Sequence, residues 1–259
     1  MKPLDDRIAL VTGASRGLGR GIALGLGEAG ATVYVTGRTE HPGQASLPGT
    51  IGRTAAEITE LGGRGIALRC DHRVDEEVEA VFTRIIEAHG RLDILVNNAT
   101  ALPEPGVLWS DRSFWEVPLG IWDDLIAVGL RSHYVATWFA APIMTRQGGG
   151  LIVNVSSRGA VMKLGLVPYS VAKAALDRMT ADTAEELRDF GVTVVSVWPP
   201  PTRTEAYHPD DEPLEPPLRT GRVVAALAAS DNLIARSGRA FPILELARDL
   251  GVAQEPAGL

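Results

Sequence analysis

The stretch Ile8-Ala-Leu-Val-Thr-Gly-Ala-Ser-Arg-Gly-Leu-Gly19 joins a short apolar run to three glycines, after which the sequence takes on helical periodicity. The apolar run predicts a buried strand, and the glycines predict a turn whose backbone can approach a diphosphate at the helix N-terminus. A glycine-rich turn also occurs for packing reasons alone, so its place directly after the first strand is what favours a dinucleotide site. The candidate contacts in this turn are Gly13, Ser15, Arg16, Gly17, Leu18 and Gly19.

Short apolar runs alternate with helical segments along most of the chain. The expected strands are Ile8–Val11, Thr32–Thr36, Gly65–Arg69, Leu92–Val96, Leu151–Val155, Thr193–Val197 and Arg239–Pro242. The expected helices are Leu18–Ala29, Gly52–Leu61, Glu76–His89, Leu119–Arg146, Tyr169–Phe190 and Thr220–Ala229. Strands that are apolar throughout are buried on both faces. The alternation therefore predicts an α/β fold in one domain over residues 1–259, a Rossmann-type doubly wound parallel sheet of about seven strands with helices on both faces.

Composition excludes several classes of protein. The net charge of −7 and the pI near 5.3 argue against a nucleic-acid surface. The five histidines show no metal-ligand spacing, so no metal is expected. The single cysteine, Cys70, fits a reducing compartment, and no apolar run approaches the roughly 20 residues that span a bilayer. We expect a cytoplasmic protein with no membrane partner.

The end of the second strand indicates which dinucleotide binds. An NAD enzyme usually carries an acidic residue there for the ribose 2′-hydroxyl, whereas this chain has Arg38, with Arg16 in the glycine turn. Two guanidinium groups at one corner suit a 2′-phosphate, so the sequence favours NADP(H). Asp71 follows the third strand, where it could meet an adenine amino group or cap a turn. Further candidates at the end of the fourth strand are Asn97, Asn98 and Ala99.

Tyr169 and Lys173 form the candidate reactive pair. They stand four residues apart in an expected helix and therefore share one face. A phenol with a pKa of roughly 10 is rarely ionised at neutral pH, and a neighbouring cation favours its ionisation. Arginine supplies most of the chain's positive charge, yet a lysine stands here, and a lysine can release a proton. Taken alone, the pair is better explained by an ordinary amphipathic helix; the other motifs of the chain favour the reactive pair.

Two stretches interrupt the alternation. Residues 101–118 contain three prolines and the aromatics Trp109, Phe114 and Trp115, which favour a wall for an apolar substrate. Residues 202–219 are rich in proline and acidic residues, and both a lid and a solvated loop remain open for them.

Four motifs together resemble the short-chain dehydrogenase/reductase family from about Arg7 to Thr204. They are Thr12–Gly19, Asn97-Asn98-Ala99, Ser156-Ser157 and Tyr169-x-x-x-Lys173. The resemblance implies that Tyr169 is the general acid or base, and that Lys173 binds the nicotinamide ribose and lowers the pKa of the tyrosine. It implies that Ser157 binds the substrate oxygen, with Ser156 as the alternative that the usual spacing selects. It also implies cofactor contacts from Pro199, Thr202 and Thr204.

The sequence departs from the family pattern at two positions. Gly129 stands where the family commonly has an asparagine that holds the water feeding protons to the lysine, and Pro200 replaces a glycine. The resemblance implies an NADP(H)-dependent oxidoreductase of the carbonyl reductase or alcohol dehydrogenase type. Its expected substrate is an apolar ketone or aldehyde, and the expected assembly is a homodimer or homotetramer. A catalytically weak NADP-binding sensor or scaffold is the alternative.

Overall fold

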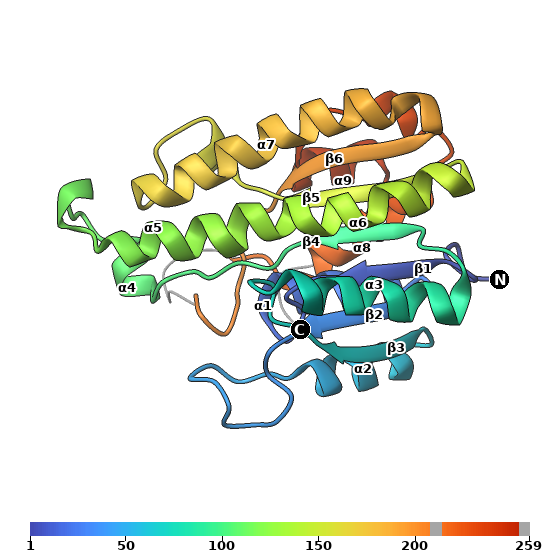
Figure 1. Ribbon diagram of the computed structural model, residues 1–259, viewed down its shortest axis with the longest axis horizontal. Helices are drawn as coiled ribbons and strands as arrows, with labels where there is room; N and C mark the ends of the chain where they lie inside the picture. Colours follow the sequence, from blue (N-terminus) through green and yellow to red (C-terminus); the bar gives the residue numbers. More distant parts are fainter. Residues whose placement is uncertain (208–213, 254–259) are drawn as a thin grey trace.

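A seven-stranded parallel sheet forms the centre of the computed structural model, which describes residues 1–207 and 214–253 (Figure 1). Its strands lie in the order β3-β2-β1-β4-β5-β6-β7. They are β1 (Ile8–Val11), β2 (Thr32–Gly37), β3 (Arg64–Arg69), β4 (Ile94–Asn97), β5 (Gly150–Val155), β6 (Val192–Trp198) and β7 (Ala240–Pro242). Every pairing is parallel. The predicted doubly wound sheet is therefore confirmed, and each strand lies within two residues of its expected position.

Helices cover both faces of the sheet. One layer consists of α1 (Gly17–Glu28), α2 (Ile51–Glu60), α8 (Pro217–Ala228) and α9 (Ile243–Asp249). The other consists of α3 (Asp75–His89), α6 (Ser132–Gln147) and α7 (Val167–Leu187), which lie in front of the sheet in Figure 1. Successive residues of β1 pack alternately against the two helical layers. Ala9 and Val11 belong to one core, and Ile8 and Leu10 belong to the other. This two-sided burial explains why β1 is apolar at every position.

The longest expected helix is interrupted. In place of one helix over Leu119–Arg146, the structure has α5 (Leu119–Ile126), a π-helical turn η2 (Ala127–Arg131) and α6. Gly129 is the central residue of that turn. A π-turn inserts an extra residue into the helical ladder, and such turns occur mostly at functional sites.

The structure also contains short elements that the sequence did not predict. They are α4 (Pro105–Leu108), α9, and the 3₁₀ turns η1 (Phe114–Glu116), η3 (Arg158–Ala160), η4 (Arg188–Phe190) and η5 (Ile234–Arg236). Most are too short to show a helical period.

Helices α1 and α8 approach each other through glycine. A Cβ atom added to Gly25 would lie 2.3 Å from the backbone carbon of Gly221, and one on Gly21 would lie 2.3 Å from that of Pro217. Backbone cannot move aside as a flexible side chain can, so the absence of side chains sets the distance between the two helices.

We therefore expect Gly25→Ala to lower the free energy of unfolding by about 1–3 kcal/mol, because its methyl group overlaps the backbone of α8. Gly52→Ala on α2 is the matched control. Its Cβ meets no atom within 4 Å, and alanine in a helix is up to about 1 kcal/mol more favourable than glycine. Urea denaturation of both variants measures the difference. Equal stability of the two variants would contradict the packing argument.

Candidate active site

The side chains of Ser157, Tyr169 and Lys173 come together at the carboxyl edge of the sheet. Ser157 is the second residue after β5 and the N-cap of η3, while Tyr169 and Lys173 lie on the first two turns of α7. Ser157 and Tyr169 are joined by a side-chain hydrogen bond. The Lys173 Nζ lies 5.7 Å from the centroid of the Tyr169 ring. The edge on which they meet is the one where ligands bind in open α/β sheets.

Lys173 is held inside the protein. Its residue is 6% exposed, and Nζ donates a 2.9 Å hydrogen bond to the carbonyl oxygen of Val155, the last residue of β5. Burial disfavours the ammonium and lowers the lysine pKa to about 8, although the Asp177 carboxylate one turn away opposes the shift. A lysine with a pKa near neutrality can both give and take a proton.

Tyr169 behaves differently from the expectation that Lys173 lowers its pKa. Burial raises the pKa of this phenol above its usual value, and the hydrogen bond with Ser157 opposes that shift. The lysine ammonium points to the Val155 carbonyl, so desolvation dominates. The phenol is therefore protonated at neutral pH, which is the state required of a general acid.

The two adjacent serines have different partners. The Ser156 hydroxyl donates to the Lys173 carbonyl at 3.3 Å and so ties β5 to α7. The Ser157 hydroxyl accepts from the Gly159 N–H at 3.0 Å and contacts the Tyr169 phenol. Only Ser157 therefore lies beside the phenol, whereas Ser156 is engaged with helix backbone.

The glycine turn between β1 and α1 is built for close backbone approach. Gly13 and Gly17 have φ angles of +65° and +57°, which side chains rarely adopt. A Cβ on Gly19 would lie 2.3 Å from the Asn98 Nδ2 atom. Asn98 in turn donates from Nδ2 to the carbonyl oxygens of Thr12 and Gly13, at 2.8 and 3.0 Å. The predicted residue Asn98 thus stiffens the turn that shapes this edge.

A carboxylate already binds at the N-terminus of α1. The Gly17 N–H donates a 2.8 Å hydrogen bond to Oε2 of Glu205, which comes from the loop after β6. This carboxylate also interacts electrostatically with Arg16 and Arg20. The contact demonstrates that this helix end accepts an anion, as a diphosphate site requires. Sequence reasoning missed Glu205 because nothing in the sequence shows that residue 205 returns to residue 17.

Arg16 and Arg38 lie close enough for their charges to interact. Arg16 donates to the carbonyl oxygens of Pro48 and Gly49 and to the Thr39 hydroxyl, so much of its hydrogen-bonding capacity holds the loop before α2. Arg38 is exposed. Of the two, Arg38 therefore has the freer guanidinium group for an incoming anion.

Some predicted cofactor contacts have other roles in this structure. Asp71 accepts from the Arg73 N–H at 3.0 Å and so caps a local turn. Asn97 is fully buried, and its side-chain amide donates to Thr137 of α6 and to Asn154 of β5. The Ala99 N–H donates to the Thr12 hydroxyl at 3.0 Å, which joins the ends of β4 and β1. The remaining residues of the turn are Ser15, which precedes the N-cap Arg16, and Leu18, which lies in the first turn of α1.

The segment after β6 returns to the glycine turn. A Cβ on Gly17 would lie 3.6 Å from Cγ2 of Thr204, so that threonine is next to the anion site. Thr202 is buried and donates to the Pro200 carbonyl at 2.7 Å, which fixes the three-proline run that follows Trp198 and begins at Pro199. Residues 208–213 of the second predicted loop lie outside the described residues.

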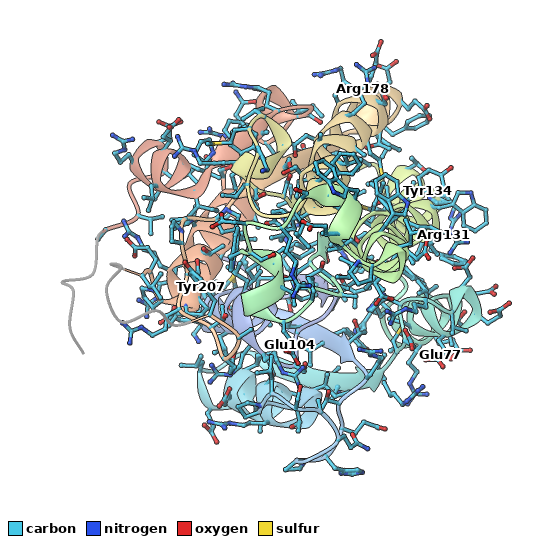
Figure 2. All side chains as sticks on the ribbon, turned by 90° about the vertical axis from the view of Figure 1, so that its left-hand side faces the viewer. Glu77, Glu104, Arg131, Tyr134, Arg178 and Tyr207 are labelled. Carbon is cyan, nitrogen blue, oxygen red and sulfur yellow. The ribbon has the colours of Figure 1, made fainter. Side chains whose placement is uncertain are left out.

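Trp109 of the first predicted loop lies against the reactive tyrosine. Its ring centroid is 6.2 Å from that of Tyr169 and 5.9 Å from that of Tyr207, which lies on the face turned toward the viewer in Figure 2. Tyr169 also packs against a small apolar cluster formed by Leu108, Val117 and Leu166. The phenol is therefore bordered by apolar side chains. Phe114 and Trp115 are exposed and contact each other.

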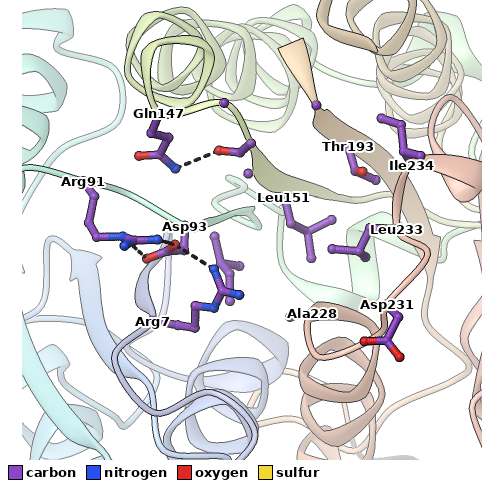
Figure 3. A pocket seen from close by; sticks show the side chains of 15 residues that line it. Arg7, Arg91, Asp93, Gln147, Leu151, Thr193, Ala228, Asp231, Leu233 and Ile234 are labelled. Carbon is purple, nitrogen blue, oxygen red and sulfur yellow. Dashed lines mark hydrogen bonds and ion pairs between the residues drawn. The ribbon is translucent and has the colours of Figure 1, made fainter. Parts of the chain in front are cut away.

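A cavity of about 380 Å³ lies at the opposite edge of the sheet (Figure 3). It is lined by residues at the amino ends of the strands, among them Arg7, Asp93, Leu151 and Thr193. The Arg7 and Arg91 guanidinium groups both bind the buried Asp93 carboxylate there. Its position separates it from the reactive side chains. In residues 1–207 and 214–253, no cluster of His, Cys, Asp and Glu could hold a metal ion, and no helix has the length and apolar content to cross a membrane.

Comparison with known proteins identifies the architecture. The family model described as short chain dehydrogenase matches residues 7–214. The chain belongs to the short-chain dehydrogenase/reductase family. It is thus an oxidoreductase of a family that uses nicotinamide cofactors and acts on small molecules, as the four motifs predicted.

Individual relatives agree with this assignment. Dehydrogenase/reductase SDR family member 1 of Mus musculus is 43% identical over 96% of this chain and 83% of its own length. A 3beta-hydroxysteroid dehydrogenase of Mediterraneibacter gnavus is 32% identical over 79% of this chain and 69% of its own. The structure of a metagenomic short-chain oxidoreductase in complex with NADP superposes with a TM-score of 0.73 at 32% identity, covering 88% of this chain and 93% of that one.

The burial of Lys173 lowers the stability of the folded protein while it provides a group that the reaction uses. Below pH about 8 the lysine is charged in both the folded and the unfolded chain, so folding carries the cost of burying an ammonium. Between about 8 and the usual 10.5, the folded chain has lost a proton that the unfolded chain still holds, so the wild type gains stability as pH rises. Lys173→Met lacks this gain.

We therefore expect the stability of Lys173→Met relative to wild type to be highest below pH 8 and to fall by about 3 kcal/mol between pH 8 and 10.5. Urea denaturation at a series of pH values measures this change. A difference that is constant with pH would show that burial does not lower the pKa of Lys173. The variant should lose catalytic activity throughout.

Proposed function

We propose that this protein is an NADP(H)-dependent carbonyl reductase or alcohol dehydrogenase for apolar ketones and aldehydes. One observation carries the proposal: the Tyr169 phenol, hydrogen-bonded to Ser157, lies between the buried Lys173 and the ring of Trp109. A protonated phenol beside a hydroxyl, a readily deprotonated amine and an apolar wall is what the reduction of a carbonyl group requires.

Each side chain has a separate part in the reaction. Ser157 donates a hydrogen bond to the substrate oxygen and holds it beside the phenol. Tyr169 gives its proton to that oxygen as negative charge develops there, and it takes the proton back in the reverse reaction. Lys173 stabilises the tyrosinate that forms and restores its proton. In the substrate-free protein burial keeps the phenol protonated, so the acid is ready before the substrate binds.

The residues at the glycine turn fit a dinucleotide. The diphosphate would bind the N-terminus of α1 at Gly17 and its neighbours, displacing the Glu205 carboxylate, and Lys173 would bind the nicotinamide ribose. Backbone near Thr202 and the Thr204 hydroxyl would meet the carboxamide. When bound, the reduced nicotinamide supplies the hydride. Arg38 and Arg16 support NADP over NAD, since no acidic residue stands at the end of β2 to receive a 2′-hydroxyl.

Assembly and location are further parts of the proposal. We expect a homodimer or homotetramer that pairs through α5, α6 and α7, as the family resemblance implies. The exposed side chains Trp122, Trp138 and Val171 on these helices support this surface. A cytoplasmic location is proposed from the single cysteine in the sequence.

Replacing Tyr169 by Phe should lower kcat for carbonyl reduction by about 10²–10⁴, because the proton donor is lost while the ring remains. NADPH binding should change little. The measurement is the loss of NADPH absorbance with a panel of aromatic, aliphatic and steroid ketones. Tyr134→Phe is the control, because Tyr134 points outward from α6 (Figure 2).

The same assay separates the enzyme from an NADP-binding sensor or scaffold. If wild type binds NADPH but reduces no substrate faster than Tyr169→Phe does, the enzyme proposal is wrong and the binding protein stands.

Arg38→Ala should raise the Kd for NADPH about tenfold and leave the Kd for NADH nearly unchanged, because one charge-assisted contact to the 2′-phosphate is lost. Fluorescence titration of both cofactors measures these constants. Arg178→Ala is the control, since Arg178 is an exposed residue of α7. Equal losses for NADPH and NADH, or equal affinities in the wild type, would contradict the assignment of Arg38.

A further inference from the structure

The π-turn at Gly129 raises the question of what serves Lys173 in place of the family's helix asparagine. A Cβ atom on Gly129 would meet only the Thr100 hydroxyl, at 3.3 Å. Glycine carries no polar side chain, so the relay group has to come from elsewhere. The next residue on this face of the helix is His133, four positions on.

His133 is buried and has one unused polar atom. It is 1% exposed, and its Nε2 lies 2.8 Å from the carbonyl oxygen of Ala99. A carbonyl oxygen only accepts, so Nε2 carries the proton and Nδ1 is an acceptor. Within residues 1–207 and 214–253, this Nδ1 has no hydrogen-bond partner. A buried acceptor without a donor is costly, which points to a group that pairs with it.

Asn97 has a second unused acceptor on the same side of the sheet. Its Nδ2 donates to the hydroxyl of Thr137 at 3.0 Å and to Oδ1 of Asn154 at 2.9 Å, which uses both amide hydrogens. Its Oδ1 is buried and has no partner among the described residues. Thr137 is one turn beyond His133 on α6, so the two residues share one face of that helix. Asn97 of β4 binds Thr137 and therefore packs against that same face.

Lys173 lies close enough to His133 for the ammonium to act on the imidazole. Asn97, the last residue of β4, pairs with Asn154 of β5, so Ala99, two residues beyond β4, and Val155, the last residue of β5, lie within one residue of the same level. Neighbouring strands are about 4.8 Å apart. His133 is bound to the first of these carbonyl groups and the Lys173 ammonium to the second. The ammonium has further hydrogens to donate, and the histidine and asparagine have lone pairs to accept.

We propose that His133 is a positioning residue of the proton relay: its Nδ1 and the Asn97 Oδ1 hold the water that reprotonates Lys173. This inference rests on the proposed function. A water that donates to both acceptors keeps its lone pairs toward the ammonium, and three polar partners suffice for a buried water. After Tyr169 has given its proton to the substrate, the Lys173 ammonium supplies the proton that restores the phenol. Once the ammonium has lost a proton, the neutral amine is an acceptor, so the held water turns one hydrogen from its acceptor to Nζ and gives the amine that proton, and solvent returns a proton to the hydroxide that remains.

Charges around His133 fit a neutral acceptor. Burial and the ammonium of Lys173 lower its pKa to about 3, against the opposing bond to Ala99, and His72 beyond β3 also disfavours the charged form. His72 has a pKa lowered to about 4 by burial, so both imidazoles are neutral when the enzyme is assayed near pH 7. Among the described residues, the other ionisable groups that act on this site are Lys173, Asp177, whose carboxylate acts on Lys173, and Tyr169, whose ring lies beside the Lys173 ammonium. A change in the pH profile thus reports on Lys173, with its neighbour Asp177, and on Tyr169.

Two substitutions separate the relay from a purely structural role. His133→Gln keeps an N–H donor near the Nε2 position but no acceptor at Nδ1, whereas His133→Asn keeps an acceptor near Nδ1 and loses the bond to Ala99. We expect His133→Gln to lower kcat about tenfold and to shift its pH profile, with NADPH affinity unchanged within about twofold. His133→Asn should keep kcat within about threefold of the wild type.

The opposite order, with His133→Asn impaired and His133→Gln active, would show that the imidazole only holds Ala99, and it would overturn the proposal. So would equal effects of the two variants or an unchanged pH profile. If either variant does not fold, ¹⁵N NMR of the wild type decides: a protonated Nδ1 between pH 6 and 9 overturns the proposal. Failure of the proposed function is distinct, because the wild type itself would then reduce no carbonyl substrate.

Discussion

The hydroxyl of Thr12 joins the two halves of the sheet, and the site depends on that connection. It accepts hydrogen bonds from the N–H groups of Asn98 and Ala99, at 2.9 and 3.0 Å. Thr12 follows β1 and the other two residues follow β4, the two strands between which the direction of winding reverses. Crevices for ligands form at such a reversal in open α/β sheets. One buried hydroxyl thus fixes the glycine turn against the neighbouring strand end.

Burial determines the chemistry of the reactive groups. It raises the pKa of the Tyr169 phenol and lowers that of Lys173 to about 8, so the acid is protonated while the amine is close to releasing its proton. The same burial makes Lys173 a cost to folding. The fold tolerates that cost because the ammonium has a carbonyl partner at the end of β5.

The loop after β6 connects the cofactor end with the substrate end. Glu205 lies at the N-terminus of α1, and Tyr207, two residues on, contacts Trp109 beside the reactive phenol. An anion that displaces the carboxylate therefore acts on a segment that also borders the substrate wall. This proximity gives a physical route by which cofactor binding can reshape the substrate side of the site.

The sequence by itself determined the seven strands, the doubly wound sheet and the family, because strands buried on two faces must be apolar and a phosphate turn needs glycines at fixed spacing. It also named Ser157, Tyr169 and Lys173, which the structure brings together. Only the tertiary structure decided between Ser156 and Ser157 as the neighbour of the phenol. It alone revealed Glu205, the π-turn at Gly129 and the unused acceptor of His133. Those features depend on contacts between residues far apart in the chain, and local sequence patterns carry no information about such contacts.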